Sequence, residues 1–347
     1  MSLITYILKR LLSLIPVLLG VLTITFFLSR LLPGDPALAY LHGRLSGQHL
    51  VGLSEKEIYD TILHQLWLDR PLILQYFKYI GDLFTGNWGY SIAINKGQDV
   101  WSLIMLKLPK TLDLALFSFI IASFVGVRVG IISAKHRNKP KDTIIRGVAL
   151  LGVSIPVFYL GVLLQYIFGF KLKLFPATGI KNMAYEEPEF ITGFRLIDLL
   201  LTGKLYLVTD YLHHMFLPVM CLAFVSLAGI TRQSRSSMLE VLEQDYIRTA
   251  RAKGCRERDV IYSHAEKNTL IPTITVIGLN FGTVLTGAVL SETTFGIKGV
   301  AQLLMDSIIS SEYWILNALV FVFTLLFVLI NLGTDILYAF IDPRIRY

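Results

Sequence analysis

Residues 11–32 read LLSLIPVLLGVLTITFFLSRLL, an apolar run interrupted only by small polar residues and Arg30. A helix of this length measures roughly 33 Å at about 1.5 Å per residue, which is enough to cross a hydrocarbon core of about 30 Å. Lys9 and Arg10 precede the run, so a secretory signal peptide is the alternative, but the run is too long and no small-x-small cleavage pattern follows it. The sequence Pro33-Gly34-Asp35-Pro36 is typical of a turn that ends a helix. We therefore expect a membrane span here.

Five further apolar runs are long enough to cross a bilayer. They cover roughly residues 111–134, 143–170, 213–232, 272–294 and 314–338. The composition agrees, because only 16% of the 347 residues are charged and the mean hydropathy is +0.61, whereas a soluble globular chain contains roughly 25% charged residues. The sequence predicts an all-α membrane protein with about six transmembrane helices and a large external segment after the first.

Basic residues gather on one side of this predicted arrangement. They lie in the loop 135–141, in residues 232–268 with eight Lys and Arg against six acids, and near the two chain ends at Lys9, Arg10, Arg344 and Arg346. Residues 33–110 and 171–212 instead balance positive against negative charges. The positive-inside rule then predicts that both termini are cytoplasmic. Because the net charge of +7 comes from segments that flank spans, it indicates a membrane protein and no nucleic-acid partner.

The first external segment contains an amphipathic stretch, Pro71–Phe84, which is rich in aromatic residues. Such a density of aromatic side chains can form a ligand surface. It can also form a small cap that packs on itself and on the lipid headgroups, and we favour that interpretation.

The motifs of common catalytic and metal sites are absent from the sequence. It contains no G-x-x-x-x-G-K-[ST] phosphate loop, no H-E-x-x-H and no C-x-x-C. His213 and His214 are adjacent and would point about 100° apart on a helix, while Cys221 and Cys255 suggest no disulfide framework. We expect no catalytic residue, no metal ligand and no cofactor bound by this chain. If the protein moves solute against a gradient, the energy comes from ions or from another polypeptide.

Residues 236–254 between the fourth and fifth spans resemble a docking element. Leu239, Leu242, Tyr246 and Ala250 recur at helical spacings of three and four and predict one apolar stripe. Gly254 stands where a glycine in the left-handed conformation would end that helix. A second short helix can follow, with Glu257 and Asp259 near its start and Val260, Ile261, His264 and Ala265 on one face. The segment is either an ordinary loop packed on the bundle or a surface for a partner.

Here the sequence resembles a known family, the permeases of ATP-binding cassette importers, in the dipeptide, oligopeptide and nickel branch. Arg248-Thr249-Ala250 followed by Gly254 is similar to the coupling loop of these permeases, with Arg in place of the usual acidic residue, and Glu266-Lys267 stands where the branch usually has Leu-Arg. Further similar strings occur in the same order along the whole chain: Leu32–Pro36, Leu108–Leu112, Ser154–Pro156, Glu292–Gly299 and Asp342–Arg346. Residues 192–198 lean toward the dipeptide (B-type) permeases within the branch.

The resemblance implies a type I importer bundle in a prokaryotic plasma membrane. Residues 1–110 would form the first span and the external cap, and residues 111–347 the permease domain with a coupling segment at 233–268. The implied partners are a second similar permease subunit, two ATPase subunits that bind ATP and magnesium, and an extracytoplasmic solute-binding protein. The residues expected to couple to the ATPases are Leu239, Leu242, Tyr246, Arg248, Thr249, Ala250 and Gly254.

Candidate residues of the translocation path lie in the second and fifth spans. Asn280, Thr283 and Thr286 share one helix face, near Gly278 and Gly282, and either line the path or serve helix packing. Arg128 either reaches toward the basic loop or lines an inner cavity. Glu292 and Phe295 would belong to an external gate. The expected cargo is a dipeptide or oligopeptide; relatives also carry nickel chelates, glutathione or oligosaccharides. A self-contained secondary transporter or channel, and a membrane-bound enzyme, are the alternatives from other classes.

Overall fold

The computed structural model describes residues 3–31, 37–38, 41, 55–65, 67–186 and 189–341, and the regular elements of this part of the chain are helices. An isolated antiparallel bridge joins Tyr90 to Asp99. The predicted turn at 33–36 and the end of the chain at 342–347 lie outside the described residues. The helices in chain order are α1 (Leu3–Leu31), α3 (Glu55–Gln65), α4 (Leu72–Thr85), α5 (Val100–Lys135), α6 (Pro140–Ser154), α7 (Val157–Leu164), η1 (Gln165–Lys171), α8 (Arg195–Leu201), α9 (Leu205–Leu242), α10 (Asp245–Ala252), α11 (Glu257–Asp259), η2 (Val260–Ala265), α12 (Glu266–Phe295), α13 (Val300–Ile309) and α14 (Tyr313–Ile341).

Five helical stretches are long and apolar enough to cross a membrane, and a bent pair could form a sixth span. The five stretches are Leu11–Arg30, Val100–Lys135, Leu205–Leu242, Glu257–Phe295 and Tyr313–Thr334. The prediction of an all-α membrane protein with about six spans is confirmed. The helices α5 and α9 contain 36 and 38 residues and measure about 54 and 57 Å, so both extend well beyond a hydrocarbon core of about 30 Å.

The third predicted span, 143–170, is not one straight helix. The segments Pro140–Ser154 and Val157–Lys171 meet at an angle of 108°. Pro156 causes the break, because a proline lacks an N–H group and its ring disfavours helical geometry in the residue before it. Ile155 accordingly adopts extended backbone angles, φ −88° and ψ 124°. The pair is either a broken span or a re-entrant segment.

The chain divides into two compact units, and one of them contains residues 8–109 and 298–328. Its core includes Tyr79 and Trp88 from the aromatic-rich external segment, while Phe77 is exposed. The buried carboxylate of Glu312 orders the loop between α4 and α5. Its Oε1 accepts hydrogen bonds from the Ser91 hydroxyl at 2.9 Å and from three successive backbone N–H groups of residues 92–94. Tyr79 and Trp88 pack in one hydrophobic cluster with Leu22 and Phe26 of α1 and with side chains of α14, so this segment is held against the long helices of its unit.

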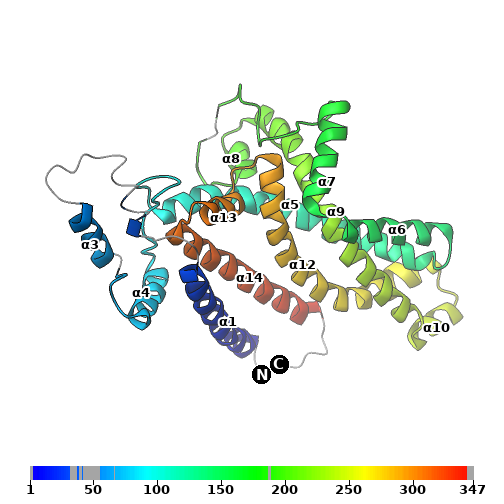
Figure 1. The fold of residues 1–347 in the computed structure, drawn as a ribbon. Coiled ribbons are helices and arrows are strands. Elements are labelled where there is room, and N and C mark those ends of the chain that lie inside the picture. The colour runs from blue at the N-terminus through cyan, green and yellow to red at the C-terminus, as the bar shows by residue number, and fades with distance from the viewer. Residues whose placement is uncertain are drawn as a thin grey trace. The chain divides into compact units, whose positions relative to one another are not determined.

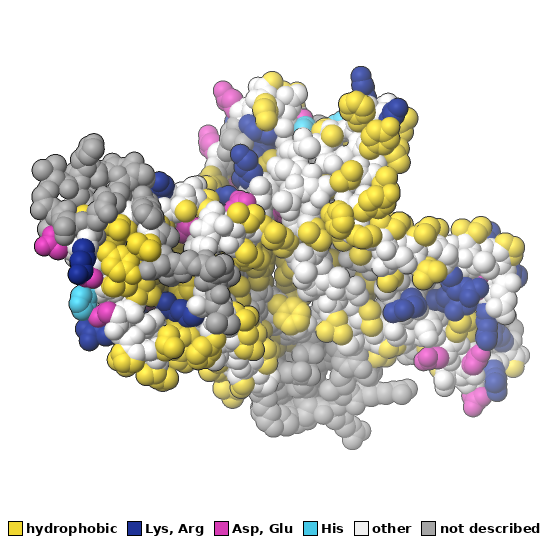
Figure 2. Space-filling view, viewed as in Figure 1, with side chains coloured by type: hydrophobic (Ala, Val, Ile, Leu, Met, Phe, Trp, Pro, Cys, Tyr) yellow, Lys and Arg dark blue, Asp and Glu magenta, His cyan; other side chains and the backbone are white. Residues whose placement is uncertain are grey.

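The other unit contains residues 1–7, 110–297 and 329–347 and includes the predicted coupling segment. Its central helix pair is α9 with α12, and α5 approaches α9 closely through Gly130. A Cβ atom at that glycine would lie 2.6 Å from the Ser234 Cβ and 2.7 Å from the Thr231 carbonyl oxygen, so a side chain there would force the helices apart. Figure 1 shows α10 at one end of this unit. Figure 2 shows hydrophobic side chains over much of the surface of its helices, as expected for a protein in lipid.

Candidate functional site

The centre of the predicted coupling segment is the eight-residue helix α10, which has one buried face and one exposed face. Ile247 is fully buried and Ala250 nearly so. They pack in a hydrophobic cluster whose other members include Met238, Val260, Ile261 and Ala265. The side chains of Tyr246, Arg248 and Thr249 are exposed on the other side. The helix is thus anchored on the bundle and presents a polar and aromatic surface outward.

The ends of α10 are determined by local chemistry. Gln244 adopts extended angles, with ψ 150°, and so separates α10 from α9. Asp245 in the first turn and Arg251 in the last turn complement the helix dipole. Gly254 has φ +79°, which confirms the predicted left-handed conformation. The N–H of Gly254 donates to the Arg251 carbonyl at 2.9 Å and the N–H of Cys255 to the Ala250 carbonyl at 3.2 Å, which is the hydrogen-bond pattern of a Schellman motif.

Two side-chain contacts fix α10 against the elements that follow it. Arg251 donates two hydrogen bonds to the Glu257 carboxylate, from Nη2 at 2.8 Å and from Nε at 3.2 Å, across the glycine turn. Asn268 Nδ2 donates to the Tyr246 hydroxyl at 2.7 Å and so joins the first turn of α10 to α12. Both contacts are exposed, so each stabilises the fold only modestly, and they add to the buried contacts of Ile247 and Ala250 that hold α10 on the bundle.

The predicted apolar stripe of Leu239, Leu242, Tyr246 and Ala250 does not form as one helical face. The helix α9 ends at Leu242 and α10 begins at Asp245, so the spacing of 3.6 residues per turn does not continue across the break. Leu239 and Leu242 are partly buried against the same hydrophobic cluster as Ala250, whereas Tyr246 is 42% exposed. Of the predicted coupling side chains, Tyr246, Arg248 and Thr249 are therefore the ones available to a partner.

The predicted second elbow helix is also different in the structure. Residues 257–265 form the short α11 and the π-helical turn η2, which run directly into α12. Val260, Ile261 and Ala265 are buried as expected, but His264 is exposed. The wider turn of a π-helix shifts side chains relative to the α-helical period, which explains why the prediction of a single face was wrong for His264.

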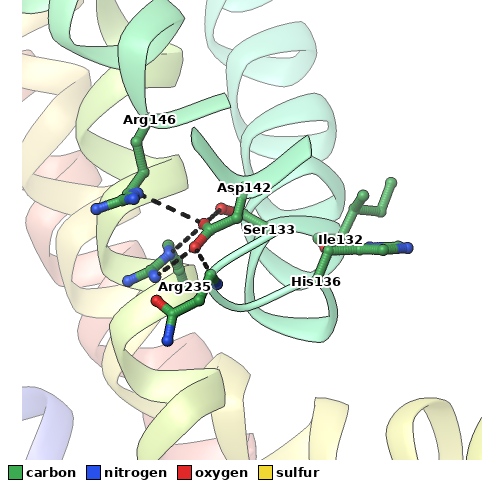
Figure 3. A network of polar contacts seen from close by, with 7 residues as sticks. Ile132, Ser133, His136, Asp142, Arg146 and Arg235 are labelled. Atoms are coloured by element: carbon green, nitrogen blue, oxygen red, sulfur yellow. Dashed lines mark hydrogen bonds and ion pairs between the residues drawn. The ribbon is translucent and has the colours of Figure 1, made fainter. Parts of the chain in front are cut away.

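A buried ion pair between α6 and the start of the coupling segment was not predicted from the sequence. Asp142 at the start of α6 is fully buried, and its carboxylate accepts hydrogen bonds from Arg235 Nε at 2.8 Å and Arg235 Nη2 at 2.9 Å (Figure 3). Ser133 of α5 donates to the same carboxylate at 2.5 Å, the backbone N–H of Asn138 donates at 3.1 Å, and Arg146 lies 3.7 Å away. The pair joins α5, α6 and the part of α9 that leads to α10. The only sign of this ion pair in the sequence was the presence of polar residues such as Ser133, Asp142 and Arg235 inside or next to apolar runs.

The predicted path residues on α12 fall into two environments. Thr283 and Thr286 line a cavity of about 220 Å³ between α7, α9 and α12, together with Ser226 and apolar side chains. Asn280 is half-buried and donates to the Val276 carbonyl of its own helix at 2.8 Å. Gly278 serves packing, since a Cβ atom there would come within 2.3 Å of Thr334 in α14. The two threonines thus face open space.

The remaining predicted residues lie apart from these. Arg128 on α5 is about half-exposed and pairs with Glu266 at 3.5 Å. Glu292 and Phe295 are buried near the other end of α12, where the Thr111 hydroxyl donates a short hydrogen bond to Glu292. The Phe295 carbonyl accepts from the Gly179 N–H at 2.8 Å. Glu292 therefore contacts the interior of α5, and Phe295 contacts the segment between η1 and α8, so neither side chain faces an open surface.

Within the described part of the chain, no group of three or more His, Cys, Asp and Glu side chains could hold a metal ion.

Comparison with known proteins gives matches over nearly the whole chain. Residues 126–347 match the family described as "Binding-protein-dependent transport system inner membrane component". Residues 3–115 match the family of the N-terminal part of such membrane components.

Several curated relatives are similar over their full length. The chain is 39% identical to the dipeptide transport system permease protein DppB of Alkalihalophilus pseudofirmus, over 99% of each chain. It is 39% identical to the di/tripeptide transport system permease protein DppB of Pseudomonas aeruginosa, again over 99% of each. It is 35% identical to the oligopeptide transport system permease protein AppB of Bacillus subtilis, over 99% of each.

Proposed function

Because the chain belongs to the family of binding-protein-dependent transport system inner membrane components, we propose that it forms part of the membrane path of an ATP-driven importer for dipeptides or short oligopeptides. Membership of the family makes the chain a multi-pass inner-membrane transport component that is not an enzyme and binds no cofactor. The similarity to peptide permeases over nearly the full length supports the choice of cargo.

The proposed assembly contains four kinds of subunit. A second, similar permease completes the path, two ATPase subunits bind ATP and magnesium, and an extracytoplasmic binding protein delivers the peptide. Residues 111–347 act as the permease domain, and residues 1–110 supply an additional span and an external cap. The exposed Thr283 and Thr286 border the path, and Glu292 and Phe295 belong to its outer gate.

The geometry of α10 is the observation that supports coupling to the ATPases most directly. The helix rests on buried Ile247 and Ala250 and exposes Tyr246, Arg248 and Thr249. An amphipathic helix outside the spans, anchored on one face and polar on the other, is suited to lie in a groove of a partner. Movement of the ATPases is transmitted as a rigid-body shift to α9 and α12, since α10 is connected to both.

In this proposal both termini and α10 are cytoplasmic, as the basic loops predict. Single cysteines at positions 60 and 256, in a chain otherwise free of cysteine, test the orientation. A membrane-impermeant thiol reagent should label position 60 from outside and position 256 from inside. Labelling of both positions from the same side would refute the topology.

Reconstitution into liposomes tests the function. We expect uptake of a labelled dipeptide only when the chain is combined with the second permease, the ATPases and the binding protein in the presence of ATP. Nickel chelates, glutathione and an oligosaccharide serve as competing cargoes, and preferential uptake of one of them would overturn the peptide assignment. Uptake by this chain alone, driven by an ion gradient, would instead identify a secondary transporter.

A further inference from the structure

A basic cavity lies between α5 and the second half of the coupling segment, and it has no part in the proposed transport path. It has a volume of about 570 Å³ and is lined by Arg128 and Lys135 of α5, Arg258 of α11, Tyr262 of η2 and Glu266 of α12. Three cations thus face one carboxylate. Figure 2 shows Lys and Arg side chains gathering at this end of the unit, where α10 lies.

The positive charges that line this cavity outnumber the carboxylates available to pair with them. Arg128 pairs with Glu266 at 3.5 Å, and no second cation of the described residues forms an ion pair with Glu266. Glu257, the acid near Lys135, already accepts two hydrogen bonds from Arg251. Lys135 and Arg258 are exposed and form no ion pair with any described residue. The site therefore has an excess of two positive charges, together with guanidinium and phenol donors suited to phosphate oxygens.

The surface of α5 above the cavity is apolar. Leu116, Ile120 and Phe124 are exposed by 40%, 60% and 66% and precede Arg128 at intervals of four residues, so they lie on one face of the helix. The Arg128 guanidinium lies 5.6 Å from the centre of the Phe124 ring. From Leu116 to Arg128 the helix rises about 18 Å, which is close to the thickness of one leaflet of a hydrocarbon core of about 30 Å.

We propose that this cavity binds the phosphate headgroup of an anionic phospholipid of the cytoplasmic leaflet, whose acyl chain lies along the exposed face of α5. The apolar face selects a lipid over a soluble phosphate, because a free anion would gain nothing from Leu116, Ile120 and Phe124. Basic pockets between helices on the cytoplasmic side are suited to such headgroups. The proposal depends on the cytoplasmic orientation of α10 and is independent of the cargo.

Binding to the purified full-length chain in a neutral detergent tests the proposal. Native mass spectrometry would follow titration with phosphatidylglycerol and, separately, with phosphatidylcholine. The variant Lys135→Gln/Arg258→Gln removes both unpaired cations, and Lys139→Gln/Lys141→Gln removes two exposed lysines of the neighbouring basic loop as a matched control. At about 1 kcal/mol per cation near a membrane surface, the first variant should lose about 30-fold in affinity for phosphatidylglycerol. The control should stay within about twofold of the wild type.

The single variant Arg258→Gln changes one exposed side chain and should lose about fivefold. Excess inorganic phosphate should not displace the lipid. Three results would overturn the proposal: equal affinity of the wild-type chain for the two lipids, equal losses in the two double variants, and displacement of the lipid by inorganic phosphate. The last result would assign the cavity to a soluble anion.

Discussion

Replacement of Gly254 by alanine tests the effect of backbone strain at the turn after α10 without adding a steric clash inside the chain. Gly254 has φ +79°, a conformation that costs an L-residue about 1–2 kcal/mol. A Cβ atom built at this position meets no heavy atom within 4 Å, so no steric clash adds to the cost. At about 1.4 kcal/mol for each factor of ten, the strain lowers the population of the native turn by about 5- to 30-fold relative to other conformations.

The strain should impair the interaction with the ATPase subunits and leave insertion into the membrane unchanged, because the turn lies outside the spans. We expect Gly254→Ala to reach normal abundance in the membrane but to lower both ATP-driven uptake and co-purification of the ATPase subunits. Gly254→Asn is the matched control, since asparagine adopts left-handed angles more readily than other residues with a side chain. It should lose less activity than the alanine variant.

Two results would refute this reasoning about Gly254. Full uptake and full ATPase binding by the alanine variant would mean that the segment is a passive connector. An asparagine variant as impaired as the alanine variant would mean that side-chain contact with a partner, and not backbone strain, makes glycine necessary here.

Three other predictions concern the buried ion pair, the external loop and the path. Asp142→Ala should destabilise the protein by about 3–5 kcal/mol in chemical denaturation, because Arg235 would be left without its partner. Glu243→Ala, which removes the exposed pair of Glu243 with Arg137, should cost at most about 1 kcal/mol. Equal effects of the two variants would contradict the role of burial. Burial alone would raise the pKa of Asp198, but hydrogen bonds from the side chain and backbone of residues 191–193 lower it below its ordinary 3.8. This stabilisation is complete well above the ordinary value and is lost as the pH falls through the lower folded pKa. On acidification below about pH 4 the wild type should therefore lose more thermal stability than Asp198→Asn, and parallel losses would refute the assignment. Finally, a bulky thiol reagent on Thr283→Cys in a cysteine-free chain should block uptake, and undiminished transport would remove Thr283 from the path.

The local features of this protein follow from the sequence because they depend on neighbouring residues. Hydropathy over about 20 residues is sufficient to predict a span. The observed helices cover the predicted runs, the first as far as Leu31 and the third with a break. The conformation of Gly254 was predictable for the same reason, since a glycine that follows an amphipathic stretch and precedes a new one indicates a left-handed turn. The resemblance of ordered motifs to importer permeases was likewise sufficient to identify the family.

The positions of helix breaks were harder to predict. Pro156 was visible in the third span, but many transmembrane helices tolerate proline, so the bend of 108° could not be inferred from its presence. The predicted stripe from Leu239 to Ala250 assumed an unbroken helix. The extended backbone of Gln244 removes that continuity, and it turns Ile247 inward and Tyr246 outward.

The tertiary structure alone decided which polar residues meet. Asp142 and Arg235 are 93 positions apart, and Ser91 and Glu312 are 221 apart. The basic cavity likewise combines Arg128 and Lys135 with residues more than a hundred positions later. Hydropathy and helical periodicity indicate which side chains of a segment face lipid, water or the protein interior, whereas the pairing of buried charges depends on how the segments pack. A single sequence therefore determines the spans and the turns, and the packing of α5, α6, α9 and α12 determines the ion pair and the cavity.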